Sequence, residues 1–120
     1  MKWNPYSANC PTRIVLDCIA DKWAVLIIGL LKIEKLRFNA LLKKIEGMSR
    51  KVLSQTLKRL ERDGLLTRTA YPTVPVSVEY ALTPLGVSLA ESLEHILLWS
   101  ERNINAVLIA QQAYDASKSN

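Results

Sequence analysis

Residues 48–65, MSRKVLSQTLKRLERDGL, decide the fold. Ser49 is a residue type that caps helix N-termini and Gly64 is the type favoured just past a helix end, so one helix is predicted to run to Asp63. At 100° per residue, three leucines share one face: Leu53, Leu57 and Leu60. The opposite side carries cationic, amide and hydroxyl side chains: Lys51, Ser54, Gln55, Lys58, Arg59 and Arg62. The helix is therefore amphipathic, with a cationic outer side.

Positive charge is concentrated around this helix. The 120 residues include 16 Lys+Arg and 11 Asp+Glu, for a net charge of +5. Residues 1–31 hold 3 basic and 2 acidic groups, residues 32–68 hold 11 and 4, and residues 69–120 hold 2 and 5. Clustered Lys and Arg release counterions when they meet phosphates, so this segment is typical of a polyanion-binding surface. A solvated helical surface is the alternative.

Length and composition limit the class of protein. A chain of this length predicts one domain over residues 1–120 and excludes most large catalytic folds. The longest apolar run, residues 23–31, is about half of the ~18 residues that a membrane span needs. No signal-peptide pattern opens the chain. We expect a cytoplasmic protein with no membrane partner.

The flanking segments predict further elements. Pro11 leads a helix over 13–20, and an almost wholly apolar helix over Lys22–Ile33 should be buried on most sides. A brief strand over 36–38 and a helix over 39–45 precede a turn at Gly47. Strands over 65–71 and 76–82 flank a Pro-containing tip and predict a hairpin.

A long last helix follows the hairpin. Thr83 supplies a cap and Pro84 a first-turn proline for a helix that reaches about residue 115, and residues 116–120 are expected to be a disordered tail. Apolar residues continue along it at a spacing of three to four: Leu89, Leu93, Ile96, Leu97, Ile104, Val107 and Leu108. A second subunit is the simplest cover for such a seam, so we expect a homodimer.

The order of these elements is that of a winged helix-turn-helix. We therefore predict a mainly α (α+β) fold with a two-stranded wing and a long C-terminal dimerisation helix. The helix over 49–63 would enter the major groove of double-stranded DNA, and a dimer would bind a pseudo-palindromic operator. A protein-interaction module that uses the basic surface on an acidic partner is the alternative. The chain shows no nucleotide-binding motif and one histidine, His95, so we expect no enzyme, catalytic residue, cofactor or metal.

Several separated motifs resemble the HxlR family of bacterial transcriptional regulators from about residue 10 to residue 100. They are Cys10-Pro11, Asp21-Lys22-Trp23, the segment 37–41, the segment 48–55, the segment 60–65 and the segment 78–86. The resemblance implies a homodimeric DNA-binding regulator that often responds to a reactive electrophile or oxidant. A small-molecule effector in a dimer-interface pocket is the alternative signal. Two departures stand out: the family commonly has a Gly pair where Ala20-Asp21 stand, and residues 71–78 of the wing carry no Lys or Arg.

Nine residues are candidates for contact with DNA. Arg50, Lys51 and Gln55 suit base edges, because Arg and Lys pair with guanine and Gln with adenine. Phosphate contacts and register are assigned to a second group: Ser49, Ser54, Lys58 and Arg59. Arg37 and Asn39 could hold a phosphate before the turn, and a plain N-cap is the alternative for Asn39.

Cys10 is the candidate redox-sensing residue. A thiol at the positive end of a helix, with Arg13 nearby, can be stabilised as the reactive thiolate, and the resemblance gives a Cys here the sensing role in redox-responsive members. An inert thiol or a small cap is the alternative. If Cys10 and Cys18 share this first helix, about 12 Å separates them, which is beyond the range of an intrachain disulfide. Cys18 is expected in the core. A small thiol enzyme is disfavoured, because no base for the thiol is visible.

Overall fold

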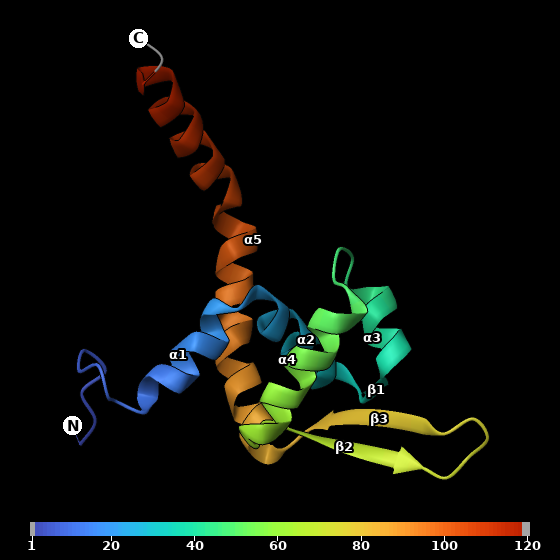
Figure 1. Cartoon of the computed structure of the whole chain (residues 1–120). Helices are drawn as coiled ribbons and strands as arrows, with labels where there is room; N and C mark the ends of the chain where they lie inside the picture. The colour runs from blue at the N-terminus through green and yellow to red at the C-terminus, as the bar shows by residue number, and fades with distance from the viewer. Residues whose placement is uncertain (1, 119–120) are drawn as a thin grey trace.

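The computed structural model describes residues 2–118 as a mainly helical protein with a small antiparallel sheet (Figure 1). The elements in chain order are α1 (Thr12–Ala20), α2 (Lys22–Ile33), β1 (Leu36–Arg37), α3 (Phe38–Lys44), α4 (Arg50–Arg62), β2 (Leu66–Tyr71), β3 (Ser77–Leu82) and α5 (Pro84–Lys118). The winged helix-turn-helix prediction is confirmed. The observed ends differ from the expected ones by one or two residues, except at the end of α5.

The core is built around α2. Ile27 and Ile28 of this helix are fully buried. They belong to one cluster with the apolar side of α4, whose buried leucines are Leu53, Leu57 and Leu60, and with Leu93 of α5. Burial of the three leucines fixes the rotation of α4, so its polar side must point away from the core.

The sheet has three strands in the order β1-β3-β2. The hairpin register runs from Leu66 opposite Leu82 to Tyr71 opposite Ser77. The brief strand expected over 36–38 is β1, and it pairs with β3, with Leu36 opposite Tyr80. The strand ends at Arg37, because Phe38 is already the first residue of α3.

The first turn of α5 is fixed against the corner between α4 and β2. Gly64 turns that corner with φ 76°, a conformation that favours glycine. The Thr83 hydroxyl donates to the Gly64 carbonyl at 2.6 Å and accepts from the Gly86 amide at 3.0 Å, which confirms the expected cap. A Cβ atom on Gly86 would lie 1.9 Å from the Leu65 carbonyl oxygen, so this approach requires glycine.

The far half of α5 leaves the body of the protein (Figure 1). Ala90 and Leu93 are buried, whereas Ile104 and Leu108 are about half exposed. At 1.5 Å per residue, the 35 residues span roughly 52 Å. Within residues 2–118, no helix combines the length and the hydropathy that a membrane span requires.

The expected disordered tail is corrected in part. Residues 116–118 continue α5, which ends at Lys118. Residues 119–120 lie outside the described residues.

Candidate nucleic-acid interface

The start of α4 is fixed by its cap. The Ser49 hydroxyl accepts a hydrogen bond from the backbone amide of Val52 at 3.1 Å, and Ser49 has extended backbone angles. This arrangement satisfies one of the free amides of the first turn. The predicted cap is confirmed, and it places Arg50 and Lys51 as the first two residues of the helix.

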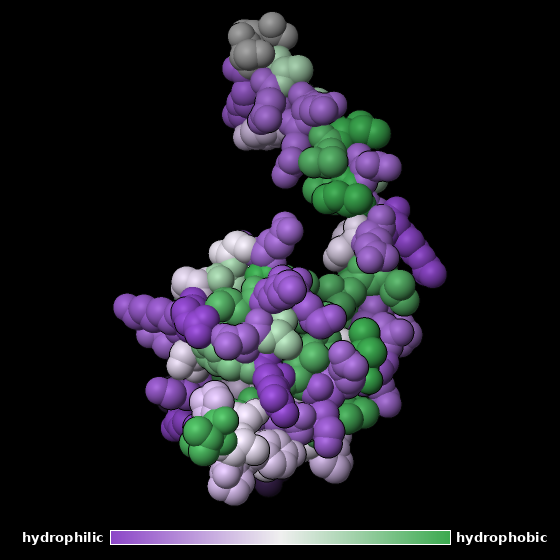
Figure 2. All heavy atoms as spheres, turned by 90° about the vertical axis from the view of Figure 1, so that its right-hand side faces the viewer, coloured by the Kyte–Doolittle hydropathy of each residue, from purple (hydrophilic) through white to green (hydrophobic). Residues whose placement is uncertain are grey.

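The polar side of α4 is open to solvent. Lys51, Gln55 and Lys58 are exposed, and Ser54 is half-buried. Figure 2 looks onto the right-hand side of Figure 1, from which α3 and the wing project, and shows hydrophilic residues gathered over the middle of that side. Lys51, Gln55 and Lys58 are therefore accessible to a ligand, as the predicted cationic outer side of this helix implies.

Arg50 is held against α3. Its two terminal nitrogens donate to Oδ1 of Asn39 at 3.1 and 3.0 Å, and its guanidinium carbon lies 5.4 Å from the centre of the Phe38 ring. The N-cap position of α3 is Arg37, without a side-chain cap bond. The N-cap alternative for Asn39 is therefore wrong. Phe38 was missed, because a ring beneath a cation 12 residues away leaves no local pattern in the sequence.

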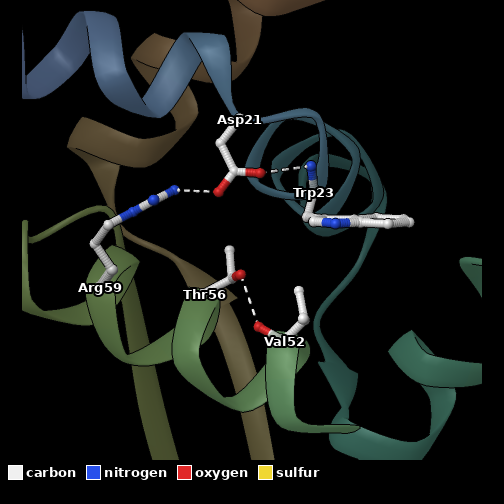
Figure 3. Close-up of polar contacts among 5 residues, drawn as sticks. All are labelled: Asp21, Trp23, Val52, Thr56 and Arg59. Atoms are coloured by element: carbon white, nitrogen blue, oxygen red, sulfur yellow. Dashed lines mark hydrogen bonds and ion pairs between the residues drawn. The ribbon is translucent and has the colours of Figure 1, made fainter. Parts of the chain in front are cut away.

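Arg59 turns inward and differs in this from the other candidates (Figure 3). One of its terminal nitrogens donates to Oδ2 of Asp21 at 2.9 Å, and the other carboxylate oxygen of Asp21 accepts from the Trp23 amide at 2.9 Å. Asp21 thus caps α2 and pairs with α4. This pairing counts against the expected phosphate contact of Arg59. Asp21 was not among the predicted site residues, although an Asp directly before a predicted helix is a common capping signal.

A groove separates the wing from α3 and the start of α4. It has a volume of about 730 Å³. One side is formed by Arg37, Phe38, Asn39, Ala40 and Arg50, and the other by residues 73–78 of the hairpin. We call residues 72–76 the wing tip and this space the wing groove.

Cys10 lies under the N-terminal arm. It is nearly buried, and its sulfur lies 3.0 Å from the Thr12 hydroxyl. Arg13 holds the arm by donating to the carbonyl oxygens of Pro5 and Tyr6 at 3.0 and 3.1 Å. The Thr12 hydroxyl bond, opposed in part by desolvation and helped by the Thr12 and Asn4 amides and the Arg13 charge, lowers the pKa of the Cys10 thiol. The direction of this shift agrees with the expectation for Cys10, but its main cause is the Thr12 hydroxyl, and the Arg13 charge contributes least.

Cys18 belongs to the core, as expected. It is 2% exposed, and burial raises the pKa of its thiol. Both cysteines are free. Among residues 2–118, no group of three or more His, Cys, Asp or Glu side chains could hold a metal ion.

These features define a winged helix-turn-helix protein whose capped fourth helix presents cationic side chains. The model of the HxlR-like helix-turn-helix family matches residues 18–107, and the chain belongs to this family. It is a transcriptional regulator of the helix-turn-helix type and not an enzyme.

Relatives and solved structures agree with this assignment. The uncharacterized HTH-type transcriptional regulator YtfH of Escherichia coli (strain K12) is 45% identical over 105 residues, which cover 88% of this chain and 83% of that protein. A structure named for the regulator YtfH of Salmonella typhimurium is 40% identical, covers 92% of this chain and 98% of its own, and superposes with a TM-score of 0.86. The redox regulator HypR in its oxidized form is 33% identical over 78% of this chain and 97% of that one, with a TM-score of 0.73.

Proposed function

We propose that the protein is a homodimer that binds a pseudo-palindromic operator in double-stranded DNA and inserts α4 of each subunit into the major groove. The observation that carries this proposal is the exposed cationic and amide side of α4, which begins directly after the Ser49 cap. An α-helix fits the major groove, and its N-terminal residues are the ones that reach base edges. Lys51 and Gln55 lie in the first two turns of α4.

The candidate residues divide by their place on α4. Lys51 and Gln55 are assigned to base edges, because both are exposed near its start. Ser49, Ser54 and Lys58 are assigned to the phosphate backbone on either side. Arg59 is left out, because its guanidinium is paired with Asp21.

The homodimer is supported by α5. From its middle onward, this helix has large apolar side chains that no described part of the subunit covers: Trp99, Ile104 and Ile109 are 61%, 48% and 65% exposed. A solitary helix in water is marginally stable, so an apolar helix that leaves the body favours a partner helix. In a dimer joined along α5, the two α4 helices would lie about 34 Å apart, so that each could enter one half-site of the operator.

The effector is proposed to be an oxidant or a reactive electrophile that modifies Cys10. The support is a thiol whose pKa is lowered by its neighbours. Solved structures with this fold include the redox regulator HypR in its oxidized form and diamide-treated YodB from B. subtilis. Modification of Cys10 would change the spacing of the two α4 helices, so the modified and unmodified dimers would bind DNA with different affinities.

Gel retardation tests the proposal. The probes are duplexes from upstream of the protein's own gene and of the adjacent gene, with an unrelated duplex of equal length as competitor. We expect specific retardation that the double variant Lys51→Ala, Gln55→Ala loses, while Arg102→Ala on α5 retains it as a matched loss of one cation. Equal competition by the unrelated duplex would instead favour the basic surface as a site for an acidic protein.

A further inference from the structure

The wing groove holds charge on one side only. Arg37 and Arg50 lie on the helical side, whereas the hairpin side consists of Thr73, Val74, Pro75, Val76, Ser77 and Val78. Val74 is fully exposed, and Val76 is 68% exposed. Figure 2 shows the pale and green colours of these weakly polar and apolar residues at the lower end of the view, below the hydrophilic surface. The groove is thus cationic on the α3–α4 side and apolar on the other.

The Arg50 guanidinium is fixed before any ligand arrives. Asn39 Oδ1 receives one hydrogen from each terminal nitrogen of Arg50, and Phe38 lies against the guanidinium. Of the five N–H donors, this leaves the edge formed by Nε and its neighbouring terminal nitrogen free. That edge can give two parallel hydrogen bonds to a phosphate or a carboxylate. Asn39 therefore acts as a positioning residue for Arg50.

Arg37 adds a second cation. It is exposed and forms no ion pair with any residue between 2 and 118, whereas its neighbour Lys35 pairs with Glu79 at 3.6 Å. Glu79 is further engaged by the Tyr71 hydroxyl at 3.0 Å, so the acidic group of the wing is already bound. The charge left in the groove is positive.

We propose that the wing groove is a clamp for one sugar-phosphate strand of DNA, in which Arg50, positioned by Asn39, and Arg37 bind phosphate while the uncharged wing tip packs on the deoxyribose. The proposal rests on the proposed DNA-binding function. It moves Arg50 from base recognition, which the sequence analysis assigned to it, to the backbone. Its basis is charge complementarity, because a DNA strand carries its negative charge on the phosphates and an apolar surface on its sugars.

Salt dependence of binding tests this clamp. Affinity is measured by fluorescence anisotropy at several salt concentrations, on a duplex selected by the wild-type protein from a random library and on an unrelated duplex. Arg50→Ala is expected to weaken binding about tenfold on both duplexes and to lower the salt slope by about one unit. Asn39→Asp should lower the slope similarly, because its carboxylate neutralises Arg50. Asn39→Ala should weaken binding less and keep the slope.

A substitution at the wing tip tests the clamp from the opposite side of the groove, by a gain of DNA affinity. Val74→Lys adds a cation to the uncharged side of the groove at a fully exposed position, so it should raise the slope by about one unit and strengthen binding on both duplexes. Arg102→Ala on α5 is the control, with an unchanged slope. A loss at Arg50 confined to the selected duplex, or a Val74→Lys variant with wild-type affinity and slope, would overturn the clamp. Absence of any preference of the wild type for the selected duplex would instead overturn the proposed function.

Discussion

Arg59 of α4 and Asp21 at the start of α2 form an ion pair across 38 positions of sequence, with 2.9 Å between nitrogen and oxygen (Figure 3). The same carboxylate caps α2 through the Trp23 amide. One side chain thereby fixes the start of the central helix α2 and holds α4 against it. The Gly pair that the family commonly has at positions 20–21 would supply neither contact.

Substitution of Asp21 separates its two roles. Asp21→Asn keeps a good capping residue and loses the ion pair, which is partly exposed and contributes at most about 1 kcal/mol. Asp21→Ala loses both, and the cap adds roughly 0.5–2 kcal/mol. Urea unfolding should therefore rank the stabilities as wild type, then Asn, then Ala. Equal losses for the two variants would show that the cap contributes nothing.

Two neighbouring cations on α4 should behave differently toward DNA. Lys58 is exposed, whereas Arg59 is engaged by Asp21. We expect Lys58→Gln to lower the salt slope of DNA binding by about one unit and Arg59→Gln to leave it unchanged. The measurement is the anisotropy titration described above. A fall in slope for Arg59→Gln would return this residue to the phosphate contacts.

Local signals in the sequence predicted most of the fold. Ser49 and Gly64 mark the ends of α4 because capping needs only residues within a few positions, and the three leucines fix its rotation because helical periodicity is local. The hairpin was predictable from the prolines at its tip, and the first turn of α5 from Thr83 and Pro84, because these signals are also local.

Pairings between distant residues were not predictable from such patterns. Helical spacing placed Arg59 with the exposed cations, but it lies near the edge of the apolar side, and a carboxylate on α2 is within its reach. The contact between Asn39 and Arg50 joins two helices across a turn. The pairing of Leu36 with Tyr80, which makes β1 the third strand of the sheet, was also not predictable, because a two-residue strand carries no pattern that identifies its partner.

Gly86 should tolerate no side chain. An added Cβ would lie 1.9 Å from the backbone oxygen of Leu65, which cannot move without shifting the corner between α4 and β2. Gly86→Ala is expected to cost roughly 1–3 kcal/mol in urea unfolding. Gly29→Ala is the matched control: its Cβ would meet only the end of the Leu97 side chain at 3.4 Å, and alanine favours the helix by up to about 1 kcal/mol.

The Cys10 thiol should react at a lower pH than an ordinary thiol. Its pKa is lowered chiefly by the Thr12 hydroxyl, so the thiolate persists to a lower pH in the folded protein than in the unfolded chain. This group therefore stabilises the fold above the unfolded pKa, and the contribution is lost as pH falls through the folded pKa. The pH midpoint of iodoacetamide labelling at Cys10 should rise in Thr12→Val. An unchanged midpoint would contradict the role of the hydroxyl.

The far half of α5 should hold two subunits together. Ile104 and Leu108 lie one turn apart, and both are about half exposed in the single subunit. The double variant Ile104→Asp, Leu108→Asp would place two charges in the seam, where burial of unpaired carboxylates is unfavourable. Light scattering after size-exclusion chromatography should give twice 13.5 kDa for the wild type and 13.5 kDa for the variant.

Asn105→Asp is the control for the charge, because residue 105 points about 100° away from Ile104 and lies outside the apolar spacing. It should remain dimeric. The buried residues of α5 all precede residue 104, so the double variant should still fold as a single subunit. Its unfolding midpoint should then depend less on protein concentration than that of the dimeric wild type. DNA affinity should fall with the dimer, because one subunit reads only one half-site. A wild type that elutes as a single subunit at micromolar concentration would show that the apolar seam has another partner.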